Sequence, residues 1–181
     1  ELVAVCTERL QVFEDSHRFI FELLARGDLD GLRIDHVDGL FDPATYLWRL
    51  QWGYLRALGR TRWEELRAAD AEFPEWSSVQ EDVLQELWPE IGGPDPRAIL
   101  GESDAPVADQ TQHVPDVLTP TARGSLPLYV VVEKILGAEE PLPKDWPIRG
   151  TTGYDFLNLV NGLFVDAEGF AKLRRSYHRF I

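Results

Sequence analysis

The feature that most constrains the fold is the stretch 31–40, Gly-Leu-Arg-Ile-Asp-His-Val-Asp-Gly-Leu. Its first half predicts a short β-strand, because the apolar Leu32 and Ile34 alternate with Arg33 and Asp35 and strand side chains repeat every two residues. An arginine next to an aspartate on one strand face is unusual, and a nearby guanidinium keeps a carboxylate ionised and oriented. The stretch therefore predicts either a functional carboxylate at a strand end or a buried ion pair that only stabilises.

A second strand is expected at 128–136, Leu-Tyr-Val-Val-Val-Glu-Lys-Ile-Leu. A continuous apolar run of this kind is typical of a strand that is buried on both faces. Glu133 interrupts the run near its carboxyl end. Since the first strand also ends in a carboxylate, a functional role for Glu133 is favoured over a core ion pair.

Helical patterns flank the first strand. Apolar spacing predicts a helix over 11–26 that ends at Gly27. A second helix is expected over 43–58, with Asp42 as its N-cap and Gly59 as its end. Strand, loop and amphipathic helix in this order form one βα unit of a parallel sheet or barrel, so the fold class is expected to be α/β.

The middle of the chain interrupts this pattern. Capping-box spacings at Thr61 and Ser78 predict helices near 62–71 and 79–88, and the proline-rich part that follows predicts loops with a short helix at 97–100. The expected organisation is a barrel segment at 1–59, a mainly helical insertion at 60–127, and a second barrel segment at 128–181. In that last segment a loop is expected at 150–153, a helix at 154–164 and a final helix capped by Asp166.

Composition narrows the function classes. The formal net charge of −13 argues against nucleic acid or an anionic membrane as a partner. The chain has one cysteine, Cys6, so it forms no intrachain disulfide, and no apolar run approaches the ~20 residues that a membrane span needs. A cytoplasmic location is expected. The absence of methionine and the start at Glu1 suggest a piece of a longer polypeptide.

Two carboxylates at neighbouring strand ends suit glycosidic bond chemistry. One must be ionised to attack or stabilise the anomeric carbon, and the other must be protonated to serve the leaving oxygen. Arg33 favours the ionised form of Asp35, and the apolar run before Glu133 favours the protonated form of that side chain. A metal site is the competing chemistry, with His36 and Asp38 as possible ligands, but the adjacent guanidinium of Arg33 would repel a cation. Neither a metal nor another cofactor is expected.

The residues of these two stretches resemble a known family. Gly31–His36 resembles the nucleophile motif of the α-amylase superfamily of retaining glycoside hydrolases, and Val131–Lys134 resembles its acid/base motif. The wider strings 33–40, 130–136 and 150–156 are similar to a branch of that superfamily that converts the reducing-end α-1,4 link of a maltooligosaccharide into an α,α-1,1 link. The similarity covers roughly 8–50 and 128–170.

The resemblance implies roles for individual residues. Asp35 would be the nucleophile and Glu133 the acid and then the base, while Arg33 would orient Asp35. His36 would hydrogen-bond the sugar before the cleaved bond, and Tyr154 would stack on the released glucose. The further substrate-binding candidates are Asp38, Lys134, Trp146, Thr151 and Thr152. The four helical tryptophans at 48, 52, 63 and 88 are interpreted as packing residues instead.

The pattern of the family is incomplete in this sequence. The superfamily uses a third carboxylate, an Asp directly after a His, and an earlier motif in which an Asp is followed at a distance by Asn-His, and neither occurs here. A whole (β/α)8 barrel takes about 250 residues, so the chain is expected to be part of a (β/α)8 TIM-type barrel, inactive or nearly so on its own, with exposed strand edges that favour self-association. Two alternatives stay open: a hydrolase or transglycosylase of the same superfamily, and a non-catalytic carbohydrate-binding or structural module.

Overall fold

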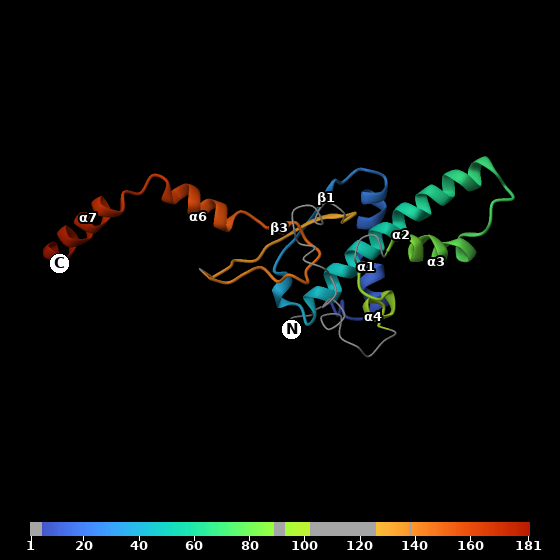
Figure 1. The fold of residues 1–181 in the computed structure, drawn as a ribbon, viewed down its shortest axis with the longest axis horizontal. Coiled ribbons are helices and arrows are strands. Elements are labelled where there is room, and N and C mark those ends of the chain that lie inside the picture. Colours follow the sequence, from blue (N-terminus) through green and yellow to red (C-terminus); the bar gives the residue numbers. More distant parts are fainter. Residues whose placement is uncertain (1–4, 89–92, 102–125, 138) are drawn as a thin grey trace.

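A computed structural model describes residues 5–88, 93–101, 126–137 and 139–181 of the chain (Figure 1). Ten elements follow one another along these residues. They are α1 (Leu10–Ala25), β1 (Gly31–Ile34), the 3-10 turn η1 (Val37–Gly39), α2 (Pro43–Ala69), α3 (Trp76–Leu87), α4 (Pro96–Ile99), β2 (Tyr129–Val132), β3 (Gly150–Thr151), α6 (Tyr154–Gly162) and α7 (Ala167–Phe180).

The three strands form one parallel sheet in the order β1-β2-β3. Ile34 pairs with Val132 in β2, and Val132 pairs with Thr151 in β3. The two predicted strands are confirmed, although each is only four residues long. β3 lies where a loop was expected, and the described part of the connection from β2 to β3 contains no helix.

Helices α1 and α2 cover one face of the sheet. The fully buried Val130 and Val132 of β2 share a core with Phe13 of α1 and with Leu47 and Leu50 of α2. Leu32 and Ile34 of β1 pack against the same core. The strand face next to the helices is thus apolar, as the alternation of side chains in β1 predicts.

The opposite face of the sheet is open in the described part of the chain. It carries Arg33, Val131 and Tyr129, and Tyr129 is 52% exposed. The prediction that the second strand is buried on both faces is therefore wrong, because no described element packs against this side. The Arg33 and Asp35 side chains are likewise exposed rather than buried.

Two helix ends test the capping arguments. α1 ends as expected: Gly27 has φ +77°, and the N–H of Asp28 donates to the carbonyl of Leu23 at 2.9 Å. Asp42 caps α2 by accepting from the N–H of Thr45 at 3.0 Å, as predicted.

The expected end of α2 at Gly59 is wrong, because the helix continues to Ala69. A glycine inside a helix costs about 1 kcal/mol at most, which other interactions along the helix offset. Glu64, expected to complete a capping box, instead pairs with Arg60 one turn away at 2.9 Å. The separate helix at 62–71 is therefore the last part of α2, and the domain boundary expected at 59/60 falls within a continuous helix.

A second core joins α2, α3 and α4. Trp88, at the end of α3, is 3% exposed and packs edge-on against Trp48 and Trp52, with ring centroids 5.7 and 4.9 Å away. Ile99 of α4 completes this core. Packing roles for Trp48, Trp52 and Trp88 are confirmed, as is the short helix near 97–100. Within the predicted insertion, residues 89–92 and 102–125 lie outside the described residues.

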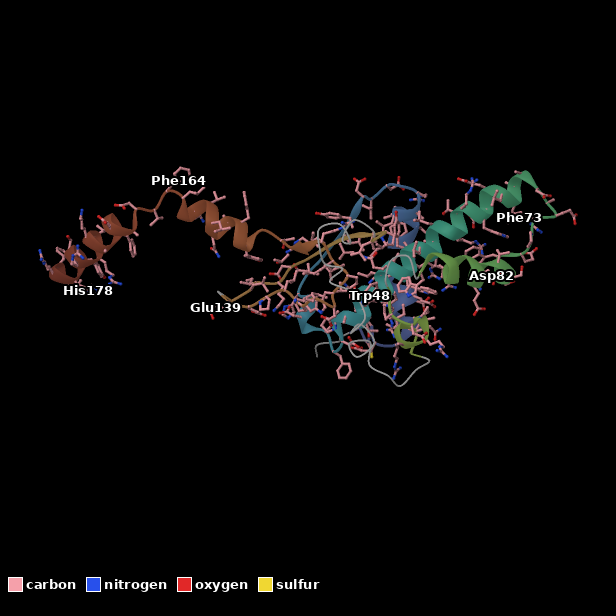
Figure 2. All side chains as sticks on the ribbon, in the orientation of Figure 1. Trp48, Phe73, Asp82, Glu139, Phe164 and His178 are labelled. Atoms are coloured by element: carbon pink, nitrogen blue, oxygen red, sulfur yellow. The ribbon has the colours of Figure 1, made fainter. Side chains whose placement is uncertain are left out.

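The C-terminal helices α6 and α7 extend away from the rest of the chain (Figure 1). Asp166 caps α7 by accepting from the N–H of Gly169 at 2.7 Å, as predicted. Figure 2 shows Phe164 and His178 far from Trp48 in the helical body, and no residue of α7 is buried. Within the described residues, no helix combines the length and apolar character that a membrane crossing requires.

Candidate active site

The parallel pairing of β1 and β2 brings the two predicted catalytic carboxylates to one edge of the sheet. Asp35 directly follows β1, and Glu133 directly follows β2. The N–H of Glu133 donates to the carbonyl of Ile34 at 2.7 Å, so the two strand ends are hydrogen-bonded at the level of the site. Because side chains alternate along a strand, both carboxylates belong to the open face, opposite the helices.

Arg33 contacts Asp35 as expected. Its Nη1 lies 2.6 Å from Oδ1 of the carboxylate, and the two side chains are 48% and 71% exposed. An ion pair this exposed contributes about 1 kcal/mol or less to stability. Its consequence is orientation, since the charge-assisted hydrogen bond favours one position of the carboxylate.

Glu133 is half-buried and contacts hydrogen-bond donors, whereas the apolar run before it suggested a desolvated side chain. The backbone N–H of His36 donates to its Oε2 at 3.3 Å. Hydrogen bonding to the same carboxylate raises the pKa of the Tyr154 hydroxyl. Residues that follow β1 and β3 therefore converge on the carboxylate that follows β2.

The segment after β3 places Tyr154 at this edge. The N–H of Thr152 donates to the carbonyl of Val132 at 2.8 Å, which continues the pairing with β2 by one residue. Gly153 then adopts φ +63°, which turns the chain into α6. A left-handed conformation at this point suits glycine. Tyr154 opens α6 as the sequence predicts, and its ring is 37% exposed.

His36 adopts a left-handed conformation, with φ 51° and ψ 42°. Residues other than glycine seldom adopt this left-handed conformation. It lets the His36 amide reach Glu133 while the side chain, 77% exposed, faces Asp38, with Nδ1 and Oδ1 3.6 Å apart. A β-carbon on Gly39 would lie 2.6 Å from the imidazole ring, so the ring rests against the glycine.

Lys134 follows Glu133 directly, and its ammonium contacts two carboxylates. Its Nζ is 2.8 Å from Oε1 of Glu140 and 3.4 Å from Oδ2 of Asp38. The bond to Glu140 raises the pKa of Lys134. The hydrogen bond from the N–H of Gly137 and the ammonium of Lys134 together lower the pKa of Glu140.

Three further candidates are not exposed at the cluster. Trp146 is 6% exposed and packs in the core with Ile148 and Leu47, so its ring is unavailable to stack on a sugar. The hydroxyl of Thr151 donates to the backbone carbonyl of Lys134 at 2.7 Å. The hydroxyl of Thr152 is buried, and no described residue bonds to it.

Sequence reasoning missed Glu140, Gly39 and Gln51. Glu140 follows a turn and has no periodic signal, and the contact of Gly39 with His36 depends on an unusual backbone angle. Gln51 is fully buried on α2 and donates hydrogen bonds to the backbone carbonyls of Leu128, just before β2, and Pro147, a few residues before β3. A glutamine among apolar helix positions is the only signal that could have identified it. In the parts of the chain that the structure describes, no three His, Cys, Asp or Glu side chains are grouped so that they could hold a metal ion.

Comparison with known proteins gives matches to two curated proteins that carry the same description. Two curated proteins of Mycobacterium tuberculosis, from strains CDC 1551 / Oshkosh and ATCC 25618 / H37Rv, each carry the description "Putative maltooligosyl trehalose synthase". Each is 26% identical to this chain over 172 residues, which is 95% of the chain and 13% of the relative. The chain thus spans about an eighth of their length. No family model and no solved structure matches the chain.

Proposed function

We propose that this chain carries the nucleophile and the acid/base of a retaining α-glycosidase-type site. The protein that contains it would be a maltooligosyl trehalose synthase, which converts the reducing-end α-1,4 link of a maltooligosaccharide into an α,α-1,1 link. The observation that carries the proposal is the in-register pairing of Ile34 with Val132, after which Asp35 and Glu133 follow at one sheet edge. The description of the two relatives supports the same substrate class.

We propose further that the three strands are neighbours in a (β/α)8 barrel. Such a barrel has parallel strands in chain order, helices outside and the chemistry at the carboxyl ends of the strands. The order β1-β2-β3 fits this arrangement, as do the helices on one face and the charged groups at the carboxyl ends. The open face with Arg33 and Val131 would then line the inside of the barrel.

The roles in the first half of the reaction follow from the chemistry of two carboxylates. Asp35 attacks the anomeric carbon to form a covalent glycosyl ester, and Glu133 gives its proton to the leaving oxygen. In the second half Glu133, now ionised, takes the proton of the anomeric hydroxyl of the released glucose. The oxygen of that hydroxyl attacks the anomeric carbon of the glycosyl ester, which forms the α,α-1,1 bond, breaks the bond between that carbon and Asp35, and frees the carboxylate.

The outcome depends on which hydroxyl reaches the intermediate. Water would give hydrolysis, so a synthase has to keep water out and the glucose in. The loop 150–154, which brings Tyr154 to the carboxyl edge of the sheet, is our candidate for holding that glucose. The third carboxylate that the family resemblance implies is not in this sequence, so we propose that it comes from elsewhere in the protein.

Turnover of maltohexaose tests the proposal in the protein as it occurs in the cell. Reducing ends and free glucose are counted together. We expect reducing ends to disappear with little free glucose, and Asp35→Asn or Glu133→Gln to slow this at least a thousandfold. Asp28→Asn and Glu139→Gln, at exposed positions, are matched controls.

Each other result has a distinct meaning. New reducing ends would show that water attacks the intermediate and that the protein is a hydrolase. Sugar binding without turnover would identify a carbohydrate-binding module. Full activity in Asp35→Asn would remove the proposed nucleophile.

A further inference from the structure

We propose that Lys134 is a positioning residue that fixes the loops after β1 and β2 against the end of β3 and thereby holds His36 and Glu133 in their working arrangement. This role rests on the proposed function in one respect only: the arrangement of His36 and Glu133 matters for turnover if the site is catalytic. It differs from the substrate contact that the sequence suggested for Lys134. The assignment is argued from where the ammonium lies and what its partners do.

The ammonium of Lys134 joins two separate loops. Asp38 belongs to η1, which follows β1, whereas Glu140 belongs to the turn that follows β2. The lysine side chain is 12% exposed, so its donors face protein carboxylates instead of solvent. An ammonium has three donors and no acceptor, and the two carboxylates can use most of that capacity. Little of the group remains for a sugar hydroxyl.

Both carboxylates are themselves held by their loops. Oε2 of Glu140 accepts from the N–H of Gly137 at 3.0 Å, which closes the turn that contains it. The other oxygen of Asp38 faces Nδ1 of His36 at 3.6 Å. Lys134 therefore acts on His36 through Asp38, one step removed from the site.

The backbone of Lys134 carries the third link. Its carbonyl accepts from the Thr151 hydroxyl at 2.7 Å, at the end of β3. A single residue thus contacts segments that follow β1 and β2 and the last residue of β3. The neighbouring Glu133 accepts a hydrogen bond from the N–H of His36, which follows β1. It also raises the pKa of Tyr154, which follows β3.

The conformation of His36 explains why such a link is needed. Its left-handed backbone is rarely adopted by L-residues, so surrounding contacts must hold it. In the described structure these contacts are the Asp38 side chain, the close approach of Gly39, and the hydrogen bond that the His36 N–H donates to the Glu133 carboxylate. Without the ammonium, the only other partner described for the Asp38 side chain is His36 itself, and η1 loses its ion pair with the segment that follows β2.

Amide hydrogen exchange tests this role without any substrate. We expect Lys134→Met to speed exchange at residues 36–40 at least tenfold, with exchange in α1 and α2 unchanged. Lys144→Met is the matched control, because Lys144 is exposed, and it should change neither region. Asp38→Asn should loosen 36–40 alone and Glu140→Gln should loosen 137–140 alone. These two variants keep the test decisive if Lys134→Met does not fold.

Turnover of maltohexaose provides the second readout. Lys134→Met should lower kcat ten- to a hundredfold with KM nearly unchanged, and Lys134→Arg should recover part of it because the charge remains. A raised KM with normal kcat would overturn the proposal and make Lys134 a sugar contact. Unchanged exchange at 36–40 would also overturn it. An active Asp35→Asn enzyme would defeat the proposed function alone, because the exchange results do not depend on it.

Discussion

Hydrogen bonding to the carboxylate of Glu133 raises the pKa of Tyr154, although 20 residues separate the two in the chain. The phenol therefore stays protonated and remains a donor. The two residues meet because β3 pairs with β2 and Gly153 turns the chain at the end of the strand. The tyrosine that the family resemblance assigns to glucose thus also orients the proposed acid/base.

Replacing Tyr154 by Phe should slow the reaction while the fold is retained. A hydrogen bond to a charged group is worth about 1.5–3 kcal/mol, so kcat should fall roughly ten- to a hundredfold. Steady-state turnover of maltohexaose measures this. Tyr177→Phe, an exposed tyrosine on α7, is the control. Normal kcat in Tyr154→Phe would mean that the ring alone matters.

Adding a methyl group at Gly39 should displace the imidazole of His36. The new β-carbon would lie 2.6 Å from the ring, which is largely exposed and can swing away. We expect the free energy of unfolding to change by about 0.5 kcal/mol or less. The value of kcat/KM should fall about tenfold if the ring hydrogen-bonds the sugar.

Gly162→Ala is the matched control for this change, because no atom lies within 4 Å of its added β-carbon. Unchanged kcat/KM in Gly39→Ala would show that the ring position is irrelevant to the substrate. Denaturant unfolding of both variants separates a local effect from a loss of stability.

Gln51 should be one of the positions most sensitive to substitution outside the site. Its amide donates to the carbonyls of Leu128 and Pro147 at 3.0 Å each, and its carbonyl accepts from the N–H of Leu128 at 3.0 Å. Leucine at this position would leave these buried groups unpaired. We expect a loss of about 3 kcal/mol or more in the free energy of unfolding, measured with denaturant. Gln11→Leu, exposed on α1, should change it by about 0.5 kcal/mol or less.

His17 should make stability depend on pH. Its Nδ1 lies 2.8 Å from the carbonyl of Phe13 and must donate to it, so Nε2 accepts from the hydroxyl of Tyr46 at 2.9 Å. Burial lowers the pKa of His17. The unfolded chain therefore takes up its proton first, and stability falls as the pH drops below about 6.5.

The comparison with His17→Gln isolates this contribution. The difference in unfolding free energy between the wild type and the variant should shrink as the pH falls from about 7.5 to 5. Chemical denaturation at a series of pH values measures it. A difference that stays constant across this range would contradict the assignment.

Much of the sheet and its site could be predicted because the signals are local. Alternation in β1 separated Leu32 and Ile34, which pack on the core, from Arg33, and the contact of Arg33 with Asp35 followed from their spacing. Side-chain caps at Asp42 and Asp166 were equally local. Each depends on neighbours within a few residues.

The features that could not be predicted depend on distant parts of the chain. Gly59 is compatible with both a helix end and a helix interior, and only packing against other elements decides between them. β3 has two residues, too few for a periodic pattern. The pairing of Lys134 with Glu140 and Asp38 requires the loops after two strands to meet.

The uncovered α6 and α7 have a consequence for spectroscopy. Helices of 9 and 14 residues are at or below the length at which isolated helices persist in water. All six tryptophans precede them, the last being Trp146. Tryptophan fluorescence therefore reports on the sheet and the helices packed against it, and it does not report on α6 or α7. Circular dichroism should lose helical signal on heating before fluorescence changes, and the two melting curves should not coincide.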